Sequence, residues 1–69
     1  MEKFTSQDGT QYWAKQINMP QCPGYWIVIG QVPGHLPFEA FDESFAKEKD
    51  AVEIAQILSE GGNIVVNPK

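Results

Sequence analysis

Residues 25–32 read YWIVIGQV, and this run decides the fold because its residues favour a strand that is covered on both faces. Ile27, Val28, Ile29 and Val32 are β-branched, and apolar residues occupy both alternating positions of the run. A strand with apolar side chains on both faces is usually central in its sheet. We therefore expect residues 25–32 to form the central strand of an antiparallel sheet.

Two shorter strands are expected before this run, over residues 3–7 and 10–17. Asp8-Gly9 stands between them, and Asp-Gly between β-favouring runs predicts a two-residue type I′ hairpin turn. Residues 18–24 read NMPQCPG. Their prolines cannot donate to a sheet ladder and their glycine weakens a strand, so this stretch is predicted to be a loop.

The second half of the chain is predicted to contain a turn, a crossover, a helix and a last strand. Pro33-Gly34 fits the centre of a type II turn, and residues 35–45 are expected to form an irregular crossover with one short strand. Residues 47–60 place apolar side chains at helical spacing, with a left-handed exit at Gly61-Gly62. Residues 63–67 read as a strand. The prediction is one α+β domain over residues 1–69, ordered β-β-β-α-β, with the helix packed on one face of an antiparallel sheet.

The length of the chain argues against an enzyme. A chain of 69 residues buries only ~60% of the surface that its unfolded form exposes. A ligand cleft of ~300 Å³ would consume much of such a small core. We therefore expect no enzymatic activity and no cofactor.

Cys22 and His35 are the two residues that most suggest chemistry, but the expected strand separates them. Eight residues in extended conformation, at ~3.3 Å each, hold the two ends ~25 Å apart, so a nucleophile and base pair is not expected. One cysteine and one histidine also fall short of a zinc site. Cys22 is interpreted as a small apolar residue under its loop, and His35 as a solvated loop residue.

Residues 39–60 hold most of the negative charge. They contain seven carboxylates and two lysines, a net charge of −5, whereas residues 1–38 sum to zero. An acidic surface repels the phosphate backbone and attracts a basic protein surface. We therefore expect no direct nucleic-acid binding, and a larger basic protein as partner. The predicted contact residues in the crossover are Glu39, Phe41, Asp42 and Glu43; the alternative for the helix carboxylates is a solvated helix face.

Two aromatic pairs, Tyr12-Trp13 and Tyr25-Trp26, add a second candidate surface. Neighbouring residues on a strand point to opposite faces, and a single helix covers one face of the sheet. Trp13 shares its parity with Ile17, and Trp26 shares its parity with Val28. Whichever set faces away from the helix forms an apolar patch, so Trp13 and Trp26 are predicted protein-binding residues. A homodimer closed over the open face would bury this patch.

The layout of YWIVIGQV, then AKEKDAVEIAQIL after Phe45, then NIVV, resembles small phage-encoded and mobile-element proteins, including several anti-CRISPR inhibitors. The resemblance covers residues 25–66 and contains no diagnostic motif. It implies a compact antiparallel sheet with one helix, and a protein that sterically blocks a large nucleic-acid-handling or defence complex of its host.

The leading hypothesis is therefore a non-catalytic protein-binding module, in its most specific form a phage-type inhibitor. One alternative is a small homodimeric structural or adaptor protein. A second alternative is a small enzyme or ligand carrier that uses the loop at residues 19–24. With a single cysteine, which cannot form an internal disulfide, and without a long apolar stretch, the chain is expected to be cytoplasmic and not to interact with membranes.

Overall fold

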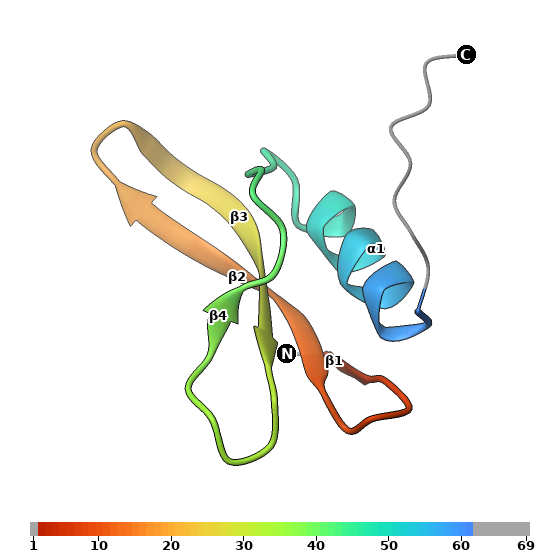
Figure 1. Cartoon of the computed structure of the whole chain (residues 1–69). Helices are drawn as coiled ribbons and strands as arrows, with labels where there is room; N and C mark the ends of the chain where they lie inside the picture. Colours follow the sequence, from red (N-terminus) through yellow and green to blue (C-terminus); the bar gives the residue numbers. More distant parts are fainter. Residues whose placement is uncertain (1, 62–69) are drawn as a thin grey trace.

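The computed structural model describes residues 2–61, except the side chains of Cys22 and Pro23, and contains a four-stranded antiparallel sheet with one helix packed on it (Figure 1). The elements are β1 (Lys3–Thr5), β2 (Gln11–Met19), β3 (Cys22–Gln31), β4 (Phe38–Glu39) and α1 (Glu48–Ser59). The predicted α+β class is confirmed. The order differs slightly from the prediction because β4 precedes the helix, and the strand predicted at residues 63–67 lies outside the described residues.

β3 is a central strand, as the apolar run at residues 25–32 predicted. It pairs with β2 on one side and with β4 on the other, and the sheet order is β1-β2-β3-β4. Val28, in its middle, has no solvent-accessible surface. The prediction of a central strand, made from apolar residues on both faces of this run, is therefore confirmed.

The loop predicted at residues 18–24 is wrong, because β2 continues to Met19 and β3 already begins at Cys22. Pro23 pairs with Asn18 in register, and the register shifts between Ile17 and Asn18. A proline fits at this place because β4 pairs with β3 only at Ile29 and Gly30, so the missing N–H of Pro23 costs no ladder hydrogen bond on the β4 side. The bulge absorbs the change in register.

The connection between β1 and β2 is a three-residue loop rather than the predicted two-residue type I′ turn. The amide of Gly9 donates to the carbonyl of Ser6 at 3.0 Å, and the amide of Ser6 donates to the carbonyl of Thr10 at 2.8 Å. Gly9 has a φ of +90°, whereas Asp8 does not have a positive φ. The Asp8 carboxylate accepts hydrogen bonds from the Thr10 amide and the Ser6 hydroxyl. This local hydrogen bonding favours the longer loop with its glycine at the last position.

The turn and crossover after β3 follow the prediction. The amide of His35 donates to the carbonyl of Val32 at 2.9 Å, and Gly34 between them has a φ of +81°. The chain then forms the short β4 and returns to the sheet at Phe45. The backbones of Phe45 and Trp26 exchange two hydrogen bonds of 2.7 and 2.8 Å, so this end of the crossover is fixed to the middle of β3.

Helix α1 starts and ends within one residue of the predicted range 47–60. Ala51 and Ala55 are fully buried and form the core with Ala14 of β2 and Val28 of β3. Small alanine side chains allow the helix axis to lie close to the sheet, so the burial comes from close approach as well as from large side chains. Phe41 and Phe45 of the crossover pack against this core.

Candidate interaction surfaces

The two tryptophans lie on opposite faces of the sheet. Trp26 is half-buried and packs against the core between sheet and helix. Trp13 follows Tyr12 and precedes Ala14, both of which contact that core, so its side chain points to the other face. The prediction that one set of alternating residues faces away from α1 therefore applies to the set of Trp13 and Ile17.

We use the name open face for the side of the sheet opposite α1. Cross-strand partners point to the same side of a sheet, and the strand register therefore identifies its members. They are Lys3, Thr5, Gln11, Trp13, Lys15, Ile17, Tyr25, Ile27, Ile29, Gln31 and Glu39.

One row of the open face crosses all four strands. Lys3 pairs with Trp13, Trp13 with Ile29, and Ile29 with Glu39. The ammonium of Lys3 lies over the Trp13 ring, 4.5 Å from its centroid, which is within the range of a cation–π contact. Trp13 is 8% exposed and Ile29 is 9% exposed. The row thus has a positive charge at one end, an apolar centre and a negative charge at the other end.

The rest of the open face is more accessible. Ile17 pairs with Tyr25 and Lys15 pairs with Ile27. Ile17 and Ile27 are half-buried, and Tyr25 is 38% exposed. The apolar part of the open face therefore extends from Trp13 toward the closed end of the β2–β3 hairpin.

The structure divides the crossover residues that were predicted to act together. Glu39 belongs to the open face. Phe41 packs on the opposite side, where its ring stacks on Phe45 with centroids 5.9 Å apart. Asp42 and Glu43 lie in the crossover between β4 and α1, where both are exposed. Of the four, only Asp42 and Glu43 are exposed carboxylates on the segment that leads into α1.

We call the carboxylates of the crossover and helix the acidic layer. Most of its members are exposed, and Asp50 is half-buried. Two of the acidic residues lie in the first turn of α1, and the last turn contains no basic residue. The acidic layer consists of Asp42, Glu43, Glu48, Asp50, Glu53 and Glu60. It lies on the crossover and on α1 together with two exposed lysines, Lys47 and Lys49, whereas Lys3 and Lys15 lie on the open face.

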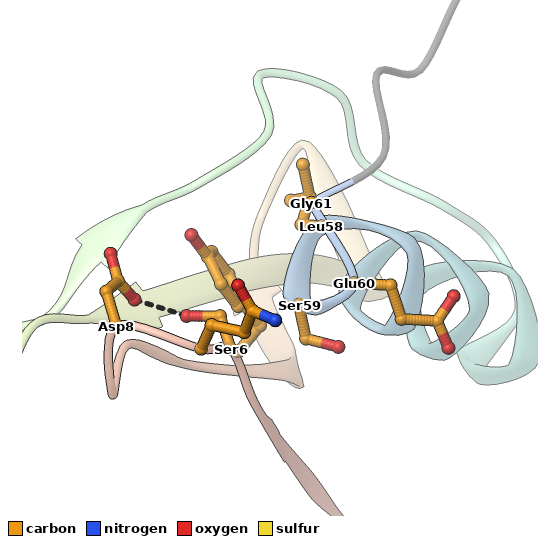
Figure 2. Close-up of a pocket in the computed structure, with 8 residues that line it drawn as sticks. Ser6, Asp8, Leu58, Ser59, Glu60 and Gly61 are labelled. Atoms are coloured by element: carbon orange, nitrogen blue, oxygen red, sulfur yellow. Dashed lines mark hydrogen bonds between the residues drawn. The ribbon is translucent and has the colours of Figure 1, made fainter.

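A surface pocket of about 640 Å³ lies between the β1–β2 loop and the end of α1 (Figure 2). It is lined by Ser6, Gln7, Asp8, Tyr12, Leu58, Ser59, Glu60 and Gly61. Hydrogen bonds from Ser6 and then from Thr10 lower the pKa of Asp8 to about 2. A carboxylate with so low a pKa remains ionised at neutral pH and is a weak general base. In this pocket, the Asp8 carboxylate serves as a hydrogen-bond acceptor that stabilises the β1–β2 loop.

Cys22 and His35 are separated by an extended strand in the structure as well. β3 begins at Cys22 and runs for ten residues to Gln31, and His35 follows beyond the Val32 turn. At ~3.3 Å for each residue, the strand alone spans ~30 Å. Residues 19–24 form the closed end of a hairpin, and they do not form the loop that the ligand-carrier alternative assumed.

Among residues 2–61, no group of three or more histidine, cysteine, aspartate or glutamate side chains is placed to hold a metal ion. In the same range there is no helix of the length and apolar character needed to cross a membrane.

Sequence reasoning missed Lys3 as a member of the open face. The sequence shows that Lys3 is on a strand, but its place over Trp13 depends on the register between β1 and β2. A three-residue loop in place of the predicted two-residue turn sets that register. The position of Asp8 between Ser6 and Thr10, both of which can donate to its carboxylate, is the signal that would have suggested the longer loop.

Comparison of the chain with protein-family models, curated proteins and solved structures finds no match.

Proposed function

We propose that this protein is a non-catalytic binding module whose acidic layer docks on a basic surface of a larger protein. The observation that supports this proposal is the separation of charge between the two sides of the molecule. The six carboxylates of the acidic layer and the two lysines of the same segment, Lys47 and Lys49, give a net charge of −4, whereas Glu39 belongs to the open face. A surface with an excess of one sign steers a partner of the opposite sign toward it.

The proposed partner is a protein that handles nucleic acid, and the proposed effect is inhibition by occupation. Channels that bind a phosphate backbone present clustered lysine and arginine residues. An acidic layer on a small rigid support competes for such a channel because it offers carboxylates where the channel otherwise binds phosphates. The resemblance of residues 25–66 to small phage-encoded inhibitors agrees with this proposal and motivates the choice of partner class.

Neutralisation of the acidic layer tests the proposal. The triple variant Asp42→Asn/Glu43→Gln/Glu53→Gln removes three charges from accessible side chains. We expect it to lose the partner that the wild type captures from cells of its native host. With the purified partner, we expect the association rate to fall by about tenfold or more, because steering depends on charge. Quantitative mass spectrometry of the captured proteins and surface plasmon resonance at two salt concentrations measure both effects.

The matched control changes net charge by the same amount outside the acidic layer. Glu2→Lys/Gln21→Lys also raises the net charge by three from −4, with Glu2 before β1 and Gln21 exposed in the turn between β2 and β3. This control should keep the partner and most of the association rate. Equal loss in both variants would mean that total charge matters and the acidic layer does not, and capture of nucleic acid in place of a protein would exclude the proposed partner class.

A further inference from the structure

We infer that the open face is a homodimer interface, in which two copies pack their sheets face to face around a two-fold axis that runs along the strands. This inference concerns the side of the molecule that the acidic layer does not use, so it stands independently of the proposed function. It commits to a second copy of this chain as the occupant because the charges of the open face complement a reversed copy of themselves.

The complementary charges lie at the two ends of the row of Lys3, Trp13, Ile29 and Glu39. Neighbouring strands are ~4.8 Å apart, so the row spans roughly 14 Å from β1 to β4. Lys3 and Glu39 at its two ends are too distant for an ion pair within one copy. Each charge lies at the border of an apolar surface and faces away from α1.

A two-fold axis parallel to the strands reverses the strand order in the second copy. β1 of one copy then lies opposite β4 of the other, and β2 lies opposite β3. Lys3 consequently faces Glu39 of the second copy, and the same pair forms again on the other side of the axis. Packed sheets are ~10 Å apart and nearly aligned, a separation that a lysine and a glutamate side chain together can bridge.

The apolar centre of the row also fits this arrangement. Trp13 of one copy lies opposite Ile29 of the other, and because both side chains are already more than nine-tenths buried in the single chain, most of the new apolar contact comes from their neighbours. Ile17, Ile27 and Tyr25 extend the contact toward the hairpin end and retain accessible surface in the single chain. Packing of a second sheet removes that surface from water, which is the main favourable term in association.

The acidic layer does not oppose such a dimer. Its carboxylates lie on the crossover and on α1, which packs on the far side of the sheet. In the dimer the two helices are therefore outermost, with two sheets between them. Charges that are more than ~8–10 Å apart and exposed to physiological salt are largely screened.

Charge exchange tests the inference with purified full-length chain. Sedimentation velocity of the wild type from about 1 µM to about 1 mM should show a monomer–dimer equilibrium. Lys3→Glu and Glu39→Lys each place like charges at both contacts, and each should raise the dissociation constant by about tenfold or more. An equimolar mixture of the two variants should form heterodimers, because the new carboxylate at position 3 of one chain then faces the new ammonium at position 39 of the other.

The double variant Lys3→Glu/Glu39→Lys should recover the dimer in a single chain. Lys49→Glu, the same change on the exposed surface of α1, should leave the dimer intact and serves as the matched control. Because Lys3 also contacts the Trp13 ring, circular dichroism must show the native fold for every variant. Ile27→Lys provides an independent disruption of the apolar contact that leaves the Lys3 contact in place.

A wild type that is monomeric over the whole concentration range overturns the inference. So does a dimer that Lys3→Glu, Glu39→Lys and Ile27→Lys leave unchanged, because its interface must then lie elsewhere. Heterodimer formation by the mixture, together with weak self-association of each variant alone, would support the two-fold arrangement and would not follow from a general effect of net charge.

Discussion

Asp8 shows how one side chain determines a connection between strands. Its carboxylate accepts hydrogen bonds from the Ser6 hydroxyl and from the Thr10 amide, and these bonds lie at the two ends of the β1–β2 loop. The loop fixes which residue of β1 lies opposite Trp13. The position of Lys3 on the open face therefore depends on a hydrogen-bonding residue that lies five positions away in the sequence.

The lowered pKa of Asp8 predicts a pH-dependent contribution to stability. The pKa falls from 3.8 to about 2 in the folded chain, so the folded state favours the ionised carboxylate. This contribution is complete above pH ~4 and is lost as the pH falls toward 2. We expect Asp8→Ala to lower the melting temperature at pH 7, and we expect the difference from the wild type to narrow between pH 4 and pH 2.

Ser6→Ala provides the control for this prediction. The Ser6 hydroxyl is the largest cause of the lowered pKa, so its removal should raise the pKa of Asp8 toward 3.8. An NMR titration of the Asp8 carboxyl carbon measures the pKa in both chains. The prediction fails if the wild-type carboxyl titrates at its ordinary value, or if the effect of Asp8→Ala on the melting temperature is the same at pH 7 and pH 2.

Gly30 illustrates what the sequence does not reveal about a single residue. It interrupts the apolar run of β3, and nothing in the local sequence explains why. In the fold, a Cβ at this position would lie 2.8 Å from a ring carbon of Phe38 and 3.1 Å from one of Tyr12. The close approach involves residues from β2 and β4, so it becomes visible only when the strand order and register are known.

At the scale of elements, the helix was predictable and the β2–β3 hairpin was not. The helix depends on local spacing, because Ala51 and Ala55 are one turn apart on the face that contacts the sheet. The hairpin depends on a tertiary condition. Pro23 is compatible with β3 because β4 is too short to reach it, and no local pattern indicates how far β4 extends.

Helix α1 begins without a side-chain cap, and this predicts a stabilising substitution. Lys47 is the N-cap residue, with φ −120° and ψ 139°, and its side chain makes no capping hydrogen bond. This backbone conformation is the one that a capping serine adopts. Lys47→Ser should raise the free energy of unfolding by about 1 kcal/mol. For a domain of this size, that corresponds to an increase in the melting temperature of roughly 4–8 °C.

Lys47→Ala separates the cap from the loss of charge. Both substitutions remove a positive charge from the end of the helix where the dipole favours anions, but only serine offers an oxygen to the free amides. Thermal denaturation should therefore rank serine above alanine. If the two variants melt at the same temperature, the gain comes from charge and the capping argument is wrong.

At the scale of the whole molecule, stability should be uneven because α1 covers only part of the sheet. The core of Ala14, Val28, Ala51 and Ala55 lies where helix and sheet meet. β1 pairs with β2 only from Gln11 to Trp13, and Figure 1 shows the closed end of the β2–β3 hairpin extending away from α1. Residues 18–25 thus form a two-stranded ribbon that is supported mainly by its own ladder, and isolated ribbons of this kind are marginally stable in water.

Native-state hydrogen exchange should resolve this difference. We expect the amides of residues 18–25 to exchange through local opening that responds weakly to denaturant. The amides of Val28, Ala51 and Ala55 should exchange through global unfolding, with free energies equal to that of equilibrium denaturation. The measurement belongs at low protein concentration, since the inferred dimer would cover Ile17 and Tyr25 at the base of the ribbon. Equal protection of the ribbon and the core under these conditions would mean that the sheet unfolds as one unit, and that the ribbon is supported by more than its own ladder.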